Sequence, residues 1–232
     1  MKTQFHIPNS PEKATLLIAS NNPGKLREVK AILAILFDQS ERTVFNVVTP
    51  VMLGLHLDVN ETGSTYAENA ALKAAAFGQA LAALGLPGRS VVMADDSGLE
   101  VDALGGAPGI HSARFTSIPG ATDADRRAAL CQRLEIYDRP WEARFTCTVA
   151  VMRTGESAPR FAAGDCRGQI IPEERGSGGF GYDPIFLVED RDLTMAELSM
   201  DEKNVLSHRA RALRLAGPLI ADLFGIASDS LS

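Results

Sequence analysis

The sequence predicts an α/β fold in which a mixed central β-sheet is flanked by helices. In the first half of the chain, short apolar runs typical of buried strands, such as 15–19 and 91–94, alternate with helical patterns at 25–37 and 65–84. In the second half, strand patterns follow one another without a long helix between them. This mixture indicates a sheet that is not wholly parallel.

Turn and capping residues mark where the other elements begin. Polar and Gly residues at 20–24 separate the first strand from the helix 25–37. Thr65, with Glu68 three residues later, matches a capping box that opens the helix 65–84. The remaining expected elements are a strand at 44–48, a helix capped by Thr122 and Asp123 and running to about 137, strands at 144–152, 160–171 and 185–188, a helical turn capped by Thr194 with Glu197, and a final helix from Ser207 to about 224.

Length and composition are those of an ordinary globular protein. The chain has 232 residues, 45% of them hydrophobic, so we expect one domain at 14–226, a loose lead-in at 1–13 and a tail at 227–232. No apolar run approaches the roughly 20 residues of a membrane-spanning helix, and the first ten residues lack the apolar core of a signal peptide. The three cysteines form no C-x-x-C pair, which argues against a disulfide framework or zinc site and favours the cytoplasm.

The segment Ser20-Asn21-Asn22-Pro23-Gly24-Lys25 is the first candidate for binding chemistry. The net charge of -6 argues against duplex nucleic acid as a partner, but a small phosphate ligand needs only a few local cations. Backbone N–H groups at a helix N-terminus attract anions, and Lys25 adds a positive charge. The segment is not a Walker A loop, because Leu26 follows the lysine. An ordinary turn with an N-cap is the alternative.

The adjacent acidic residues Asp95 and Asp96 are the second candidate. They follow the apolar run 91–94, where two carboxylates raise one another's pKa unless a cation offsets their charge. Mg²⁺ takes one or two carboxylates together with substrate phosphates. Side chains alternate along an extended chain, so the two carboxylates need not point the same way. A solvated turn with Ser97 and Gly98 is the alternative, and the end of a buried strand is where ligand crevices form in α/β sheets.

A glycine-rich segment is the third candidate. Residues 176–181 match G-x-G-x-x-G, but a dinucleotide site needs a helix after the loop, whereas Pro184 and the strand pattern 185–188 follow here. We therefore reject a dinucleotide site. A loop with aromatic residues is better suited to closing over a flat ring, with Phe180 or Tyr182 available for stacking.

The fourth candidate is a cluster of polar residues expected at the start of the last helix. Lys203, His208 and Arg209 could bind a phosphate or the edge of a base. The alternative is a solvated helix start.

In their order along the chain, these segments resemble the inosine triphosphate pyrophosphatase family, also called the Ham1-like or dITP/XTP pyrophosphatases. The resemblance extends from Leu16 to about Leu215. The segments that carry it are Ser20–Lys25; Glu61-Thr62-Gly63 with Glu68-Asn69-Ala70 and Lys73-Ala74; Ala94–Leu99; Gly106–Gly109 with Ser112–Phe115; Gly179–Pro184; and Ser207-His208-Arg209.

The resemblance implies hydrolysis of ITP, dITP or XTP to the monophosphate and pyrophosphate, with Mg²⁺, in a homodimer whose two lobes flank a substrate cleft. It implies that the segment Ser20–Lys25 holds the triphosphate, that Asp96 is the catalytic acid–base residue and a metal ligand, and that Ser97 touches substrate. The other residues that the resemblance implies bind substrate are Phe180, Gly181, Tyr182, Asp183, Lys203, His208 and Arg209. Of these, the aromatic residues and the His208-Arg209 pair are expected chiefly around the base.

One position departs from the family pattern. Family members often carry two acidic residues before the Thr-Gly of the second segment, whereas Asn60 precedes Glu61 here. We expect Glu61 to be the second metal ligand, although the ligand position could correspond to Asn60.

Two rival functions remain at this point. One is a phosphatase that forms an aspartyl-phosphate and releases orthophosphate, and the other is a nucleotide-sensing module that binds nucleotide without turnover.

Overall fold

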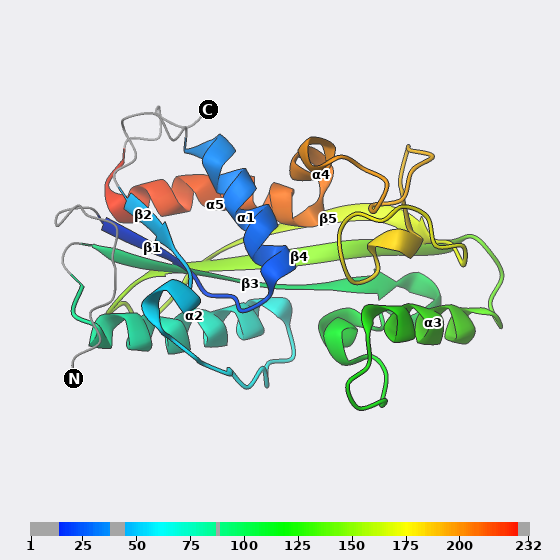
Figure 1. Cartoon of the computed structure of the whole chain (residues 1–232), viewed down its shortest axis with the longest axis horizontal. Helices are drawn as coiled ribbons and strands as arrows, with labels where there is room; N and C mark the ends of the chain where they lie inside the picture. Colours follow the sequence, from blue (N-terminus) through cyan, green and yellow to red (C-terminus); the bar gives the residue numbers. More distant parts are fainter. Residues whose placement is uncertain (1–13, 38–44, 87–88, 227–232) are drawn as a thin grey trace. The chain divides into compact units, whose positions relative to one another are not determined.

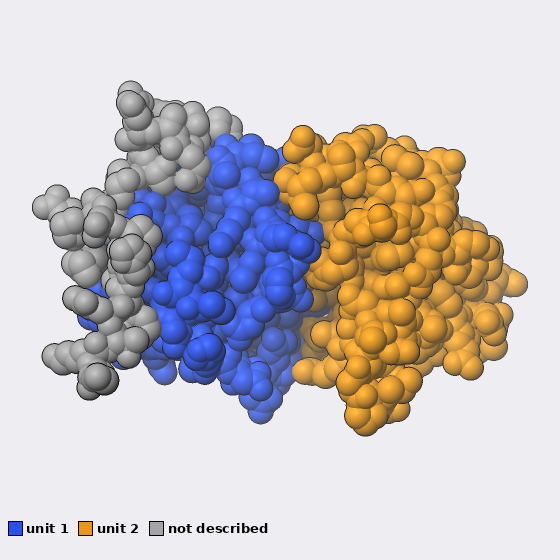
Figure 2. Space-filling view, in the orientation of Figure 1, with its two compact units in different colours: residues 1–96, 148–163, 212–232 blue, residues 97–147, 164–211 orange. Residues whose placement is uncertain are grey.

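The structure is a computed structural model that describes residues 14–37, 45–86 and 89–226. This part of the chain divides into two compact units (Figure 2). Unit 1 comprises the described residues of Met1–Asp96, Thr148–Ala163 and Ala212–Ser232, and unit 2 comprises Ser97–Cys147 and Gly164–Arg211. The expected lead-in at 1–13 and tail at 227–232 lie outside the described residues, and the single domain at 14–226 stays a prediction.

The described strands form a six-stranded sheet in the order β2-β1-β3-β4-β5-β6 (Figure 1). Strand β1 pairs in parallel with β2 and β3, whereas β6 pairs antiparallel with β5, so the predicted mixed sheet is confirmed. The strands are β1 (Ala14–Ile18), β2 (Phe45–Val48), β3 (Ser90–Val101), β4 (Trp141–Arg153), β5 (Arg160–Ile170) and β6 (Phe186–Val188).

Side-chain caps explain where most helices begin. The capping box predicted for Thr65 and Glu68 is present at the start of α2, and Thr122 caps α3 in the same way with Asp125. Asp123, expected to share that cap, is instead the first helical residue. The helices are α1 (Pro23–Leu36), α2 (Tyr66–Ala83), α3 (Asp123–Leu134), α4 (Met200–Leu206) and α5 (His208–Phe224), with short 3-10 segments at Val51–Leu53, Asp102–Leu104, Gly109–Arg114 and Asp183–Ile185.

In unit 1, α2 packs its small residues against the sheet. Ala70, Ala74 and Phe77 of α2 belong to one buried cluster with Leu17 of β1 and Val92 of β3. Helix α1 lies on the opposite side of these strands from α2 (Figure 1). Because side chains alternate along a strand, neighbouring residues of β3 therefore face different helices.

In unit 2, aromatic residues form much of the core. Phe145 and Phe186 lie with ring centroids 4.5 Å apart, and Trp141 and Tyr182 belong to the same buried cluster. This cluster supports the strands and loops that carry the predicted base-binding residues.

Strand β3 corrects an expectation about the acidic pair. Asp95 and Asp96 lie within a twelve-residue strand and not at its end. The strand can continue through two buried carboxylates because each of them has a lysine partner, described below.

The region before α5 also differs from the prediction. Lys203 belongs to a separate short helix, α4, which Ser199 and Glu202 cap. Ser207 then leaves the helical conformation, and its hydroxyl accepts a hydrogen bond from the backbone N–H of Ala210 at the start of α5. After Thr194 the chain forms a hydrogen-bonded turn and not the helical turn that was expected. The carboxylate of Glu197 does accept a hydrogen bond from the backbone N–H of Thr194. No helix in the described part of the chain is long and apolar enough to cross a membrane.

Candidate active site

The loop that follows β1 leads directly into the N-terminus of α1. Asn22 caps this helix, its side-chain oxygen accepting a hydrogen bond from the backbone N–H of Lys25 at 3.1 Å. The side chain of Asn21 is fixed by donating to the carbonyl of Leu57 at 3.0 Å. None of the residues in the first turn of α1 is acidic, so no side chain of that turn offsets the positive end of the helix. The loop is largely exposed and suited to an anion.

Asp95 and Asp96 point to different helices. The buried carboxylate of Asp95 lies 3.0 Å from the ammonium of Lys25 on α1. The carboxylate of Asp96 lies 3.0 Å from the ammonium of Lys73 on α2. The alternation of side chains along β3 therefore divides the pair, and the alternative of a solvated turn is wrong, because both aspartates are 5% exposed.

Asp96 lies in a small polar network. One of its oxygens accepts from Lys73, and the other accepts from the side-chain amide of Asn69 at 3.3 Å. The same ammonium of Lys73 lies 3.3 Å from Glu61, so one cation contacts two carboxylates. The amide oxygen of Asn69 accepts from the backbone N–H of Gly63, which ties the loop of Glu61 to α2.

Burial changes the proton affinity of this network. Desolvation raises the pKa of Asp96, and the positive charges of Lys73 and Lys25 only partly oppose it. Desolvation also disfavours the charged form of Lys73, but the carboxylates of Asp96, Asp95 and Glu61 outweigh it and raise the pKa of Lys73. Asp96 is thus a carboxylate that binds a proton more readily than an ordinary aspartate.

Lys73 and Asn69 were not among the predicted site residues. Their separation of four residues places them on one face of α2, and both are polar within an otherwise Ala-rich pattern. That spacing, and the place of both residues in segments that carry the family resemblance, were the available signals in the sequence. Neither signal could identify Asp96 as the partner of the two residues, because that contact depends on how α2 packs on β3.

In unit 2, Asp183 organises the glycine-rich loop. Its buried carboxylate accepts from Lys203 at 2.6 Å and from the backbone N–H of Phe180 at 2.8 Å. A Cβ at Gly179 would lie 2.0 Å from the same carboxylate, and the φ angle there is +74°. Glycine is therefore required at 179 for the loop to close on Asp183.

Two basic residues of unit 2 lie close to the ring of Phe180. The ammonium of Lys203 lies 5.4 Å and the guanidinium carbon of Arg209 5.7 Å from the centroid of its ring. Arg209 also donates to the hydroxyl of Ser97 at 3.0 Å, and His208 stacks on Phe145. The alternative of a solvated helix start is wrong, because Lys203, His208 and Arg209 are all buried.

The two aromatic residues of the loop have different surroundings. Tyr182 is buried in the core of unit 2, where its hydroxyl donates to the carbonyl of Ser112 at 2.9 Å and burial raises its pKa. Phe180 is only half-buried. Of the two rings, Phe180 is therefore the one accessible for stacking.

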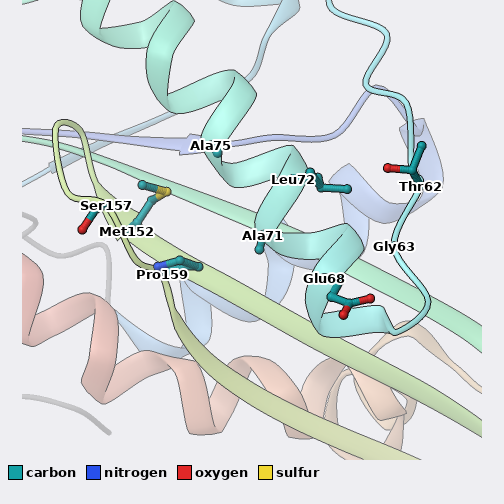
Figure 3. Close-up of a pocket in the computed structure, with 9 residues that line it drawn as sticks. All are labelled: Thr62, Gly63, Glu68, Ala71, Leu72, Ala75, Met152, Ser157 and Pro159. Carbon is teal, nitrogen blue, oxygen red and sulfur yellow. The ribbon is translucent and has the colours of Figure 1, made fainter.

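A separate cavity of about 510 Å³ lies in unit 1, beside α2 and the turn between β4 and β5 (Figure 3). None of the predicted site residues lines it. Its acidic residue, Glu68, already accepts hydrogen bonds from Ser64 and Thr65 in the cap of α2. The cavity is lined by Thr62, Gly63, Glu68, Ala71, Leu72, Ala75, Met152, Ser157 and Pro159.

Comparison with known proteins identifies relatives over most of the chain. A model of the Ham1 family matches residues 16–217. A dITP/XTP pyrophosphatase of Bacillus subtilis (strain 168) is 41% identical over 204 residues, which are 88% of this chain and 96% of that protein. A dITP/XTP pyrophosphatase of Methylococcus capsulatus is also 41% identical, over 90% of this chain and 98% of that protein.

Solved structures agree with this match. The Ham1 protein of Staphylococcus aureus is 36% identical, with a TM-score of 0.72 over 90% of this chain and 98% of that one. A HAM1 protein from Coxiella burnetii is 36% identical, with a TM-score of 0.74 over 90% of this chain and 99% of that one.

Proposed function

Because the chain belongs to the Ham1 family, we propose that it hydrolyses the non-standard purine nucleoside triphosphates ITP, dITP and XTP to the monophosphate and pyrophosphate. Such a reaction removes damaged nucleotides from the precursor pool. The curated relatives carry the name dITP/XTP pyrophosphatase, and the match extends over nearly their whole length. The observation that carries the proposal is the buried Asp96, held by Lys73, which also contacts Glu61.

The N-terminus of α1 supports binding of the triphosphate. Its N–H groups and Lys25 would neutralise phosphate charge, and the exposed residues 21–23 let the phosphate oxygens approach. Lys25 is already held at 3.0 Å from Asp95, so its position is fixed before substrate arrives. The role of Asp95 in this proposal is to orient Lys25.

Asp96 is the proposed acid–base residue. Its carboxylate would accept a proton from water as the water oxygen forms a bond to the α-phosphorus. The bond from the α-phosphorus to the oxygen that bridges to the β-phosphorus breaks, and pyrophosphate leaves with both electrons of that bond. A raised pKa suits this task, because it makes the Asp96 carboxylate a stronger base.

We propose Mg²⁺ as the metal, with Asp96 and Glu61 as the residues that would hold it. Both supply the hard oxygen donors that Mg²⁺ prefers, and the ammonium of Lys73 already places one positive charge beside both carboxylates. Among the described residues no group of three or more His, Cys, Asp or Glu side chains could hold a metal ion. Mg²⁺ can complete its shell with substrate phosphates and water, and when bound it neutralises phosphate charge.

The loop around Asp183 supports binding of the purine. Phe180 offers a half-buried ring for stacking, and Lys203 and Arg209 lie beside that ring as hydrogen-bond donors. Donors at this place would favour the 6-oxo group of hypoxanthine and xanthine over the amino group of adenine.

The family resemblance also leads us to propose a homodimer that works in the cytoplasm. Light scattering from the purified protein should give about twice the 24.8 kDa of one chain. A mass equal to one chain at micromolar concentration would exclude the dimer.

A panel of nucleoside triphosphates tests the proposed function. ITP, dITP, XTP, ATP and GTP are each incubated with the protein and Mg²⁺, and pyrophosphate and orthophosphate are measured separately. We expect pyrophosphate from the first three and little from ATP. Equal rates on ATP and ITP would refute the proposed role, and orthophosphate as the only product would favour an aspartyl-phosphate mechanism.

A further inference from the structure

The first turn of α3 contacts the backbone of the glycine-rich loop at Gly181. The carboxylate of Asp123 accepts a hydrogen bond from the N–H of Gly181 at 2.8 Å. The guanidinium of Arg127, one helical turn further on, donates to the carbonyl of Gly181 at 2.8 Å. Both polar groups of one loop residue are therefore held by two side chains at positions i and i+4 of a helix.

Each of these two side chains is itself fixed. Arg127 donates through Nε and a terminal nitrogen to the two oxygens of Glu174, both at 2.8 Å, which is the bidentate geometry of a strong ion pair. Asp123 also pairs with Arg126 through its other oxygen. Burial disfavours the charged form of Asp123, yet the hydrogen bonds from Arg126 and Gly181 outweigh it and lower its pKa. Both groups therefore remain charged near neutral pH.

Gly181 lies between the two residues whose positions matter most in the loop. On one side is Phe180, whose N–H donates to Asp183, and on the other is Tyr182, anchored in the core of unit 2. The φ angle of Gly181 is +64°, so the chain reverses sharply there. Holding the N–H and the carbonyl of Gly181 therefore fixes the direction in which the ring of Phe180 leaves the chain.

We propose that Asp123 and Arg127 are positioning residues that hold Gly181 so that the ring of Phe180 is set for the purine before substrate binds. This inference rests on the proposed function. The two residues do not touch substrate and act through the loop. Their loss should weaken binding more than it slows the chemical step, because the proposed acid–base residue Asp96 is held by Asn69 and Lys73 and not by the glycine-rich loop.

Two substitutions and a matched control test the proposal. Asp123→Ala and Arg127→Met each remove one hydrogen bond to Gly181. Asp125→Ala is the control on the same turn. The carboxylate of Asp125 accepts from the backbone N–H of the N-cap residue Thr122, so its loss weakens α3 without removing a hydrogen bond to Gly181. Steady-state kinetics on ITP should show KM raised about tenfold in the two test variants, because each has lost one charge-assisted hydrogen bond. Their kcat should stay within about threefold of that of the unmodified protein. The control should keep the KM of the unmodified protein.

Hydrogen exchange provides a second readout that does not depend on turnover. In the absence of substrate, the peptide containing Gly181 should exchange at least about tenfold faster in Asp123→Ala than in the unmodified protein, because the carboxylate of Asp123 accepts from this N–H. In Asp125→Ala the exchange rate of the same peptide should be unchanged. If Arg127→Met does not fold, Glu174→Gln at the exposed end of the ion pair replaces it, with an expected rise in KM of about threefold.

The outcomes separate this inference from the proposed function. If the unmodified protein releases no pyrophosphate from any purine triphosphate, the proposed function fails. Hydrogen exchange then still tests whether Asp123 and Arg127 hold Gly181. If the unmodified protein is active but both test variants keep its KM and its exchange rate at Gly181, the positioning role is overturned. A rise in KM that is equal in Asp125→Ala would also overturn it, because α3 would then act only through its stability.

Discussion

The ammonium of Lys73 lies 3.0 Å from the carboxylate of Asp96 and 3.3 Å from that of Glu61. This relationship joins a residue of α2, a buried residue of β3 and a partly exposed loop residue in one polar network. It gives Lys73 two tasks, since it offsets the charge of buried carboxylates and places a cation next to the proposed acid–base residue.

Lys73→Met should therefore reduce both activity and stability. Removing one partner of a buried ion pair leaves an uncompensated charge, which costs about 3–5 kcal/mol in the free energy of unfolding. We expect kcat/KM for ITP to fall about 10²-fold or more, as for removal of a preorganised charge next to the reacting group. Lys30→Met, at an exposed position of α1, is the matched control and should change neither quantity. Activity within threefold of the unmodified protein in Lys73→Met would contradict this account.

Glu61→Gln should raise the Mg²⁺ concentration needed for half-maximal activity about tenfold. Substitutions around metal sites commonly weaken metal affinity by about 10- to 100-fold, and this value lies at the lower end of that range. The measurement is pyrophosphate release from ITP as Mg²⁺ is titrated. Asn60→Ala is the matched substitution at the neighbouring position and should leave the titration unchanged. The opposite result, a shift in Asn60→Ala alone, would assign the second ligand to position 60. Chelation with EDTA should stop turnover in every active variant, and added Mg²⁺ should restore it.

Gly179→Ala should be more damaging than a glycine substitution of the same backbone conformation elsewhere. Gly155 also has a positive φ, but a Cβ there meets no atom within 4 Å, so Gly155→Ala suffers only the conformational strain of about 1–2 kcal/mol. At Gly179 the added carbon also displaces the carboxylate of Asp183. Loss of the hydrogen bond that this carboxylate accepts from Phe180 should cost about a further 1.5–3 kcal/mol in the free energy of unfolding. Urea unfolding and the KM for ITP measure both effects. Equal losses of stability in the two variants would show that the contact with Asp183 does not matter.

Arg153→Met should lower stability without changing kinetics. Arg153 donates to the carbonyl of Leu223, and Arg89 donates to that of Phe224, so two guanidinium groups satisfy the C-terminal carbonyls of α5. Loss of one of them should cost about 1–2 kcal/mol in the free energy of unfolding. Arg167→Met, at an exposed position of β5, serves as the control. The prediction fails if Arg153→Met unfolds at the same urea concentration as the control.

The elements that the sequence predicted correctly depend on local chemistry. Thr65 with Glu68 is a capping box whose two hydrogen bonds span three residues, so its effect can be read without knowledge of the fold. The alternation of side chains along a strand likewise indicated that Asp95 and Asp96 need not point the same way.

The features that the sequence did not predict depend on tertiary contacts. Whether Asp95 and Asp96 end a strand or continue it is decided by Lys25 and Lys73, which arrive from two different helices. The choice between Phe180 and Tyr182 as the accessible ring is decided by the core of unit 2, which buries Tyr182. The spacing of residues along the chain predicts neither set of contacts.

The measurement that tests the central claim most directly is the product formed from ITP by the unmodified protein and by Asp96→Asn, in the presence of Mg²⁺. We predict one pyrophosphate for each inosine monophosphate from the unmodified protein, and a kcat lowered at least about 10²-fold in Asp96→Asn, the usual contribution of general acid–base catalysis. Asp95→Asn should lose less, because Asp95 acts through Lys25. Near-normal turnover by Asp96→Asn, or orthophosphate in place of pyrophosphate, would contradict the account.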